Sequence, residues 1–229
     1  MNGSQRVTVI IPAKDEEKTI GEIIKKSAAF ADNVIVIDDS LHNGTSLEAD
    51  KYGATVLWGE GKGKGAAIRY AIEKADADIL IFIDADGSHK PEDINEILYP
   101  IQRGLADMVI ASRIKSGSDE LRGSLNNLLR LFGNKISALI INLIWNKGTK
   151  LTDVQNGFRA IKTSVARQIC LSENSFAVEQ EMVIKCLKNG FRICEVPSYE
   201  SKRLHGKSHI NPILMLPKYT WCIVKNIYS

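Results

Sequence analysis

Two aspartates stand two positions apart in the motif Asp84-Ala85-Asp86, directly after the apolar run Ile79 to Ile83. A run of that length and composition predicts a buried strand. At the end of a strand, residues two apart point the same way, so both carboxylates can reach one hard cation that also contacts a diphosphate. A second interpretation is helix capping before Pro91. The pair alone does not separate the two roles.

Polar and charged residues also follow the other apolar runs in the first half of the chain. In α/β proteins, ligands bind beyond the carboxyl ends of parallel strands, so we expect these side chains to converge on one edge of a sheet. They are Pro12, Asp15 and Glu16 after the first run, Asp38 and Asp39 after the second, Lys64 after the third, and Ser112 and Arg113 after the fifth.

Glycines alternate with other residues between Gly59 and Gly65, where a strand is expected to pass into a helix. This spacing does not match Gly-x-Gly-x-x-Gly, and Lys64 lacks the glycine spacing and the following Ser or Thr of a phosphate loop. Both nucleotide-binding fingerprints are therefore excluded. Two interpretations stay open: the backbone amides and Lys64 approach an anion at the helix start, or the segment is a solvated turn.

The elements that must position these residues follow from the hydrophobic pattern. Short β-branched runs alternate with longer helical patterns, which predicts an α/β protein with a Rossmann-like, mostly parallel sheet flanked by helices. The expected strands are Arg6 to Ile11, Asn33 to Ile37, Ala54 to Leu57, Asp78 to Ile83 and Asp107 to Ala111. The expected helices are Glu16 to Ala29, Ser46 to Tyr52, Gly65 to Lys74 and Pro91 to Gln102.

The second half of the chain is less regular. Apolar residues recur at three- and four-residue steps from Leu125 to Ile144, which predicts one long amphipathic helix or a broken pair. Such a helix most often covers a core or a dimer interface, and a membrane role is the alternative. A strand is expected at Phe158 to Ile161, a helix at Glu179 to Lys188 and a strand at Arg192 to Val196. We expect one domain over residues 1–229.

Composition excludes several classes of protein. With 229 residues, 44% hydrophobic and 25% charged, the chain is typical of a globular protein and not of a disordered or fibrous one. The net charge of +3 argues against a nucleic-acid partner. Residues 182–229 nevertheless carry eight Lys or Arg against two Glu, a basic tail that suits phosphate groups or an anionic membrane surface. The four cysteines lack the spacing of zinc or redox motifs.

The longest stretch without Lys, Arg, Asp or Glu is Ile136 to Asn146, 11 residues, whereas a membrane-spanning helix needs about 20. No secretory signal pattern precedes the first expected strand. We therefore expect a cytoplasmic protein, with contact at the cytoplasmic face of a membrane through the long helix and the tail from Ile210 to Val224.

In their order along the chain, these motifs resemble those of family-two inverting glycosyltransferases, and most of all the dolichyl-phosphate mannose synthase branch. The resemblance covers residues 6–209 and is carried by Pro12 with Asp15-Glu16, Asp38-Asp39, Gly63 to Arg69, Asp84-Ala85-Asp86, Ser112-Arg113, Gly157 to Ala160, Glu181, and Arg203 with Gly206 and Ser208. It implies a GT-A fold, a donor sugar linked to GDP or UDP, and Mg or Mn as the divalent cation. The chain departs from the family pattern at Asp15, where Asn is usual, and at Glu179, where Gln is frequent.

The resemblance also implies roles for residues. Residues 1–115 would bind the nucleotide sugar and residues 116–229 the acceptor. The implied donor contacts are Pro12, Asp15, Glu16, Asp39, Lys64 and Asp84, the implied metal ligands are Asp84 and Asp86, and the implied acceptor contacts are Arg113, Arg122, Arg203 and Ser208. Asp86, Arg113 and Arg203 would serve catalysis.

Basicity separates the candidate acceptors. A polyprenyl phosphate is ionised near neutral pH and can attack the anomeric carbon without a strong base, whereas a sugar or protein hydroxyl needs one. The phosphate requires cations instead, and arginine forks onto its oxygens. We expect a polyprenyl-phosphate acceptor. A hydroxyl acceptor, with Glu179, Glu181 or Asp153 as base, and a non-catalytic nucleotide-sugar-binding module are the alternatives.

Overall fold

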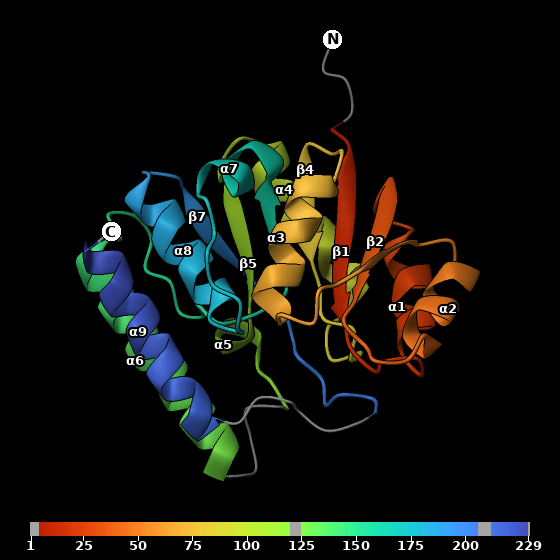
Figure 1. The fold of residues 1–229 in the computed structure, drawn as a ribbon. Coiled ribbons are helices and arrows are strands. Elements are labelled where there is room, and N and C mark those ends of the chain that lie inside the picture. Colours follow the sequence, from red (N-terminus) through yellow and green to blue (C-terminus); the bar gives the residue numbers. More distant parts are fainter. Residues whose placement is uncertain (1–4, 120–124, 206–211, 229) are drawn as a thin grey trace.

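The computed structural model describes residues 5–119, 125–205 and 212–228 (Figure 1). Within them, a seven-stranded sheet has the order β3-β2-β1-β4-β6-β5-β7, and β6 runs antiparallel to both of its neighbours while the other pairs are parallel. The strands are β1 (Val7–Ala13), β2 (Asn33–Asp38), β3 (Thr55–Trp58), β4 (Ile79–Phe82), β5 (Met108–Ser112), β6 (Arg159–Lys162) and β7 (Ile193–Pro197). Each lies within two residues of its predicted bounds.

Helices cover both faces of the sheet, as predicted from the apolar runs. Ile10 and Ile37 point to one face, where α3, α6, α7, α8 and α9 pack, and Val9 and Val36 point to the other, where α1, α2 and α4 pack. The helices are α1 (Ile20–Ser27), α2 (Gly44–Lys51), α3 (Lys64–Lys74), α4 (Ile94–Gln102) after a 3₁₀ turn at Pro91–Asp93, α5 (Arg113–Ser116), α6 (Leu125–Ile144), α7 (Thr163–Gln168), α8 (Val178–Lys188) and α9 (Pro212–Tyr228).

The first helix is shorter than predicted. Residues from Glu16 to Thr19 form a turn before α1, and Asp15 adopts the left-handed conformation with φ of 56°. Asp tolerates this conformation better than most residues. The Glu16 amide donates to Thr45 Oγ1 at 3.0 Å, so the turn is tied to the start of α2. The segment beyond β1 is thereby shaped as a loop at the sheet edge.

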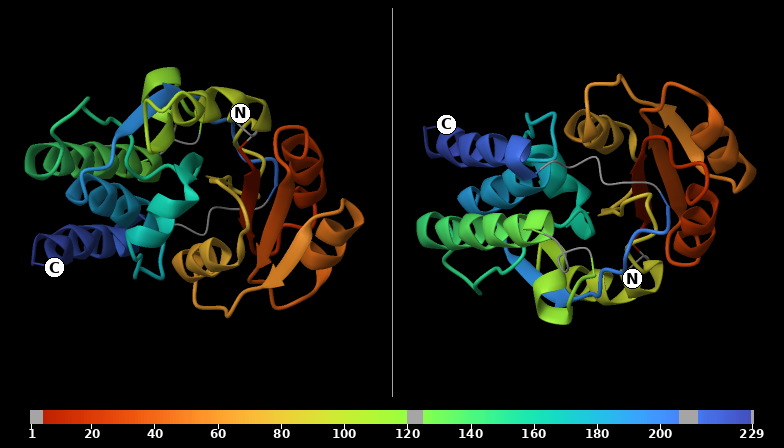
Figure 2. Two further views of the ribbon diagram at one scale, coloured as in Figure 1. Left: turned by 90° about the horizontal axis from the view of Figure 1, so that it is seen from above. Right: turned by 90° about the horizontal axis from the view of Figure 1, so that it is seen from below.

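The long apolar pattern of the second half forms one continuous helix, α6, and not a broken pair. It runs beside α9, and α9 also packs on α8 (Figures 1 and 2). Sequence analysis did not place a helix at α9, where Pro217 interrupts the helical pattern. No helix in the described parts of the chain is long and apolar enough to span a bilayer.

Asp107 joins the strands of the second half to one another. It precedes β5, accepts a bond of 2.7 Å from Lys162 Nζ at the end of β6, and accepts another of 3.0 Å from the Arg192 amide before β7. Burial acts to raise the pKa of this carboxyl, but the hydrogen bonds from Lys162 and Arg192 outweigh it and lower the pKa to about 2. The charged form of Asp107 is therefore favoured by folding.

Asp107→Asn tests the contribution of this carboxylate to stability through its pH dependence. A carboxyl whose pKa is lower in the folded state stabilises the protein above its unfolded pKa of about 3.9 and loses that contribution as pH falls through the folded pKa. We expect the difference in free energy of unfolding between wild type and variant to be constant above pH 5 and to shrink between about pH 4 and pH 2. Urea denaturation across that range measures it, with the exposed Asp50→Asn as control. A difference that stays constant down to pH 2 would contradict the assignment.

Candidate functional site

A cavity of about 290 Å³ opens where the carboxyl ends of the parallel strands meet. Its walls also include residues of α3, α6, α8 and α9, so both halves of the chain contribute. The structure brings together at this cavity most of the residues singled out by sequence, namely Pro12, Glu16, Asp39, Lys64, Asp84, Asp86, Arg113, Glu179 and Arg203.

Lys64 lies between two carboxylates at the start of α3. Its Nζ is 2.6 Å from Asp84 Oδ1 and 2.7 Å from Glu179 Oε1. Burial acts to lower the pKa of this ammonium, but the two carboxylates raise it above its ordinary value, so the cation is permanent. A β-carbon on Gly157 would lie 2.8 Å from the same Nζ, which explains a glycine at this position. Of the two interpretations left open for this segment, a solvated turn does not describe Lys64, whose ammonium is buried between two carboxylates.

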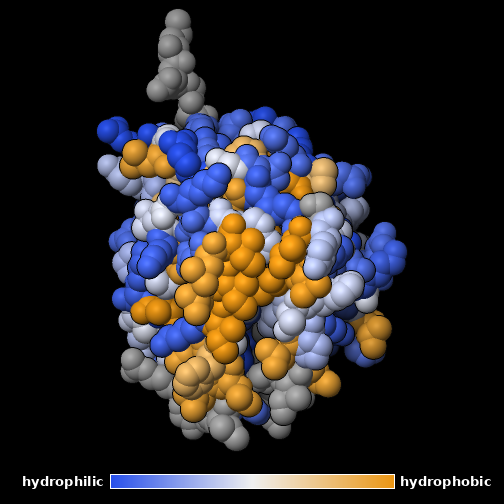
Figure 3. All heavy atoms as spheres, turned by 90° about the vertical axis from the view of Figure 1, so that its left-hand side faces the viewer, coloured by the Kyte–Doolittle hydropathy of each residue, from blue (hydrophilic) through white to orange (hydrophobic). Residues whose placement is uncertain are grey.

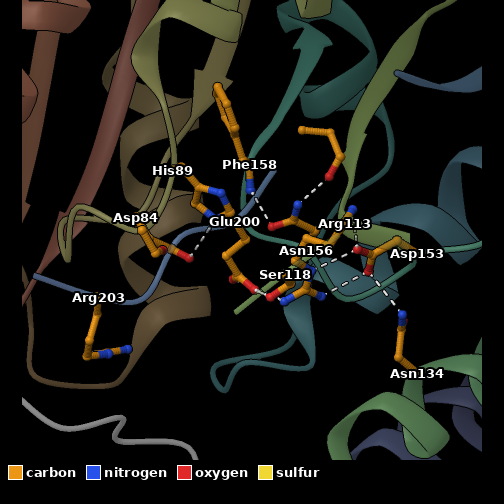
Figure 4. Close-up of polar contacts among 12 residues, drawn as sticks. Asp84, His89, Arg113, Ser118, Asn134, Asp153, Asn156, Phe158, Glu200 and Arg203 are labelled. Atoms are coloured by element: carbon orange, nitrogen blue, oxygen red, sulfur yellow. Dashed lines mark hydrogen bonds and ion pairs between the residues drawn. The ribbon is translucent and has the colours of Figure 1, made fainter. Parts of the chain in front are cut away.

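Asp84 has a second basic neighbour. His89 is buried against the ring of Phe158, and its Nε2 lies 3.7 Å from Asp84 Oδ2 (Figure 4). Burial opposes ionisation of Asp84, but Lys64 and His89 together keep the pKa of its carboxyl well below the usual range. Burial also acts to lower the pKa of His89, and the nearby carboxylates raise it overall. Asp84 is therefore an anion between two basic groups.

Asp86, the second carboxylate of this motif, contacts a different cation. Its Oδ2 is 2.8 Å from Nη2 of Arg203, and Nη1 of the same guanidinium is 4.0 Å from Glu16 Oε1. Its Oδ1 accepts hydrogen bonds from the amide and the hydroxyl of Ser88. Burial, and then the charge of Asp86, raise the pKa of Glu16. Helix capping by Asp86 is not what the structure shows, because its partners are Ser88 and Arg203.

Arg113 forms a buried network deeper in the cavity (Figure 4). Its guanidinium donates to both oxygens of Asp153 at 2.8 and 2.9 Å and lies 3.4 Å from Glu200. Asn134 of α6 donates to the same Asp153 at 3.1 Å, and Ser118 donates to Glu200. Burial acts to lower the pKa of Arg113, but the two carboxylates raise it. These bonds hold the guanidinium of Arg113, in the cavity wall, in a single orientation.

Other predicted site residues lie away from the cavity. Asp15 is exposed, and its amide donates to Ser40 Oγ. Asp153 is fully buried behind Arg113, which holds the pKa of its carboxyl low against the opposing effect of burial. Neither residue is among those that line the cavity. Arg122 and Ser208 lie outside the described residues.

Glu181 has its hydrogen-bond and ion-pair partners outside the cavity lining. Its carboxylate accepts hydrogen bonds from the amides of Ser172 and Glu173 and pairs with Lys185 at 3.0 Å. Burial acts to raise the pKa of Glu181, but these bonds lower it. Glu181 does not line the cavity, because its side chain fixes the loop before α8 instead of reaching the site.

That loop is packed tightly on the helix that carries Lys64. The Gly65 amide donates to the carbonyl of Asn174 at 2.9 Å, and Arg69 donates to the carbonyl of Glu173 and to the Asn174 side chain. A β-carbon on Gly65 would lie 2.1 Å from the Glu173 carbonyl oxygen. Only glycine permits this approach between backbone segments more than 100 residues apart.

Sequence analysis missed several residues of the cavity wall, namely Arg130 on α6, Gln155, Phe176, Glu200 and Tyr219 on α9. Arg130 lies within the predicted amphipathic helix as one of its polar positions, which was the available signal. Tyr219 gave none, because the helix that carries it was not predicted. Burial raises the pKa of the Tyr219 phenol, so that it enters the cavity as a neutral hydroxyl.

Comparison with known proteins gives the family. The profile of "Glycosyl transferase family 2" matches residues 8–169, which span β1 to the end of α7. The chain belongs to glycosyl transferase family 2. The motif-based prediction is confirmed, and with it the assignment as a glycosyltransferase. The match includes Asp84 and Asp86 but ends before α8 and α9, whose residues complete the cavity wall.

Individual relatives agree with this membership. The chain is 31% identical to Glycosyltransferase AglJ of Haloferax volcanii over 90% of its own length and 67% of that protein. It is 28% identical to Undecaprenyl-phosphate mannosyltransferase of Micrococcus luteus, over 90% and 88%. A crystal structure of Mycobacterium tuberculosis glucosyl-3-phosphoglycerate synthase with Mn²⁺, UDP and glucosyl-3-phosphoglycerate superposes with a TM-score of 0.75 at 20% identity, covering 97% of this chain and 80% of that one. The likeness confirms the predicted GT-A fold.

Two glycine substitutions test the packing around α3. Gly65→Ala forces a β-carbon against the Glu173 carbonyl, and overpacking of this kind costs about 1–3 kcal/mol. Gly133→Ala, in α6, meets open space and replaces a glycine in a helix interior, which stabilises by about 0.5–1 kcal/mol. Urea denaturation should therefore show that Gly65→Ala lowers the free energy of unfolding and that Gly133→Ala raises it. Equal effects at the two positions would contradict the close approach at Gly65.

Proposed function

We propose that this family-two enzyme transfers a sugar from a nucleotide-sugar donor to the phosphate of a polyprenyl phosphate, with inversion at the anomeric carbon. One observation carries the proposal: Arg130 and Tyr219 line the charged cavity from α6 and α9, the two helices whose outer side is apolar and exposed. A molecule with an anionic head and an apolar tail matches both surfaces. The relative named undecaprenyl-phosphate mannosyltransferase supports the same acceptor class.

The donor nucleotide would bind on the side of the cavity formed by β1 and β2. Pro12, Glu16 and Asp39 line that side, and the Gly61 amide donates to Asp39 Oδ1 at 3.1 Å. A β-carbon on Gly59 would overlap the Asp39 carboxylate, so the glycine leaves room for that side chain. A carboxylate in this position suits the hydroxyls of a ribose or the polar edge of a base. GDP and UDP both meet that description.

The residues fit a divalent cation, as follows from the chemistry of Asp84 and Asp86. Both carboxylates reach the same cavity and offer hard oxygen ligands. No group of three His, Cys, Asp or Glu that could hold a metal occurs in residues 5–119, 125–205 and 212–228. A small cation such as Mg²⁺ binds through one or two carboxylates together with substrate phosphates and water. When bound, Mg²⁺ or Mn²⁺ would offset the charge that develops on the nucleoside diphosphate.

The acceptor phosphate would meet the guanidinium groups of the cavity. Arg113 is held by Asp153 and Glu200, and Arg203 by Asp86 and Glu16, so their positions are set before a ligand enters. Prepositioned guanidinium groups bind phosphate at a lower entropic cost than mobile ones. Of the three candidate bases for a hydroxyl acceptor, Asp153 and Glu181 lie outside the cavity lining with their carboxylates bonded elsewhere. Glu179 lines the cavity and pairs with Lys64 through Oε1.

The membrane contact would be made by an apolar face on α6 and α9 (Figure 3). We define this face by its exposed residues, Leu128, Leu129, Phe132, Ile136, Leu139 and Leu143 of α6 and Leu216, Trp221, Val224 and Ile227 of α9. The exposed Lys135 and Lys218 belong to the same two helices. Apolar side chains with neighbouring cations suit an anionic bilayer surface. The enzyme would thus take its acceptor at the cytoplasmic face of a membrane.

Transfer assays with paired acceptors test the proposed reaction. We expect sugar from GDP-mannose, UDP-glucose or UDP-N-acetylglucosamine to appear on polyprenyl phosphate, and no transfer to the corresponding polyprenol, which needs a base. Mass spectrometry of the lipid fraction measures the product. Asp86→Asn should lower the rate by at least 100-fold and remove its dependence on Mn²⁺, whereas Asp119→Asn, outside the cavity lining, should not.

Two outcomes would contradict the proposal. Transfer to the polyprenol at the rate of the phosphate would exclude an acceptor role for ionised phosphate. Full activity of Asp86→Asn with an unchanged Mn²⁺ dependence would remove this residue from the cation site.

Arg203→Lys should recover only part of the activity that Arg203→Ala loses, because an ammonium cannot reproduce forked contacts with phosphate.

Vesicle binding tests the apolar face. We expect the protein to sediment with anionic vesicles at low salt, and the double variant Phe132→Ser/Trp221→Ser to bind at least 10-fold more weakly, since each buried aromatic side chain contributes about 1.5–3 kcal/mol. Leu41→Ser is the matched control, because Leu41 is 91% exposed but lies near α2. Equal binding of wild type and double variant would exclude this face as the contact.

A further inference from the structure

A carboxylate oxygen in the wall of the cavity has no hydrogen-bond partner among the described residues. Glu179 is 3% exposed, and its Oε1 pairs with Lys64, but its Oε2 is buried without a hydrogen-bond partner among the described residues. A buried acceptor without a donor costs about 1–3 kcal/mol, and more if charged. Buried polar groups are nearly always hydrogen-bonded, so an exception at a ligand cavity indicates a ligand contact.

The backbone carbonyl of Glu179 is fixed by a buried hydrogen bond. Arg159, fully buried on β6, donates to the Glu179 carbonyl at 2.7 Å, and Asn156 accepts from the same guanidinium through its own carbonyl. In the side chain of Glu179, the ion pair with Lys64 fixes one carboxylate oxygen, Oε1. The carboxylate therefore cannot turn away from the cavity without breaking an ion pair of 2.7 Å.

The position of Glu179 indicates which part of a substrate it meets. Lys64 bridges Glu179 to Asp84, so the free oxygen lies one ammonium group away from the proposed cation site. The proposed nucleotide contacts, Pro12 and Asp39, are on β1 and after β2, whereas Glu179 is on α8. The group of a nucleotide sugar that follows its diphosphate on the side away from the nucleoside is the sugar itself.

We infer that Glu179 Oε2 accepts a hydrogen bond from a hydroxyl of the donor sugar, and that this contact selects the sugar. The inference rests on the proposed function for its donor class, and it assigns Glu179 a binding role in place of the general-base role that a hydroxyl acceptor would require. A site built around a buried acceptor rejects a ligand that lacks the matching hydroxyl, because the carboxylate oxygen is then left unpaired. Phe176 and Tyr219 line the cavity with Glu179 and supply apolar surface and a neutral hydroxyl for the same ring.

Monodeoxy donors with Glu179→Gln test the contact directly. The parent donor is whichever of GDP-mannose, UDP-glucose or UDP-N-acetylglucosamine the wild type binds, and binding of the parent and each of its monodeoxy analogues is measured by calorimetry with Mn²⁺ and without acceptor. We expect wild type to bind one analogue about 10- to 100-fold more weakly than the parent, the range for a hydrogen bond to a charged group. In Glu179→Gln that one penalty should fall below 3-fold, while the penalties at other positions persist.

The comparison of ratios separates this role from a structural one. A variant that merely disturbs Lys64 and Asp84 would weaken parent and analogues alike and leave every ratio unchanged, which would overturn the inference. Glu173→Gln, with the same loss of charge in the adjoining loop outside the cavity lining, should keep all wild-type ratios. Because the assay contains no acceptor, failure of lipid-phosphate transfer would refute the proposed function without altering this result.

Discussion

The ammonium of Lys64 is the interaction on which the site depends. It begins α3, and through Asp84 and Glu179 it joins the end of β4 to the start of α8, which are 95 residues apart in the chain. Removing the cation would leave two carboxylates side by side in a poorly solvated wall, and breaking such a buried pair costs about 3–5 kcal/mol. The glycines at 65 and 157 serve this contact, since they allow the loop before α8 and the turn before β6 to approach α3 closely.

The cavity is highly charged, and several of the charges that face it are paired with a specific neighbour. Arg113 is matched by Asp153 and Glu200, and Arg203 by Asp86 and Glu16. Such pairs hold side chains in orientations that a phosphate or a diphosphate can use. Glu179 is also paired, through Oε1 with Lys64, but its Oε2 has no hydrogen-bond partner among the described residues.

Sequence patterns were sufficient for the parts of the fold that rest on local rules. The strands were found because both sheet faces are covered, so each strand reads as a continuous apolar run, and the carboxylates of residues 84 and 86 were found because they follow such a run. The partner of each charge could not be found in this way. The sequence left Lys64 as either an anion-binding residue or part of a solvated turn, and Arg113 as a phosphate ligand, because the carboxylates that pair with them come from positions 153, 179 and 200. Only tertiary contact reveals such pairing, and α9 was missed because Pro217 masks its helical pattern.

The antiparallel strand β6 constrains the order in which this protein can fold during its synthesis. It is inserted between β4 and β5 and comes from beyond residue 158, so the sheet has two unsatisfied strand edges until that segment leaves the ribosome. Exposed edges of apolar strands are prone to aggregate. The nascent chain must therefore keep β4 and β5 apart, or covered, while about 50 further residues are synthesised, a matter of several seconds at ordinary rates of translation. The cavity is also completed late, since α8 and α9, which contribute Glu179 and Tyr219 to its wall, follow β6 in the chain.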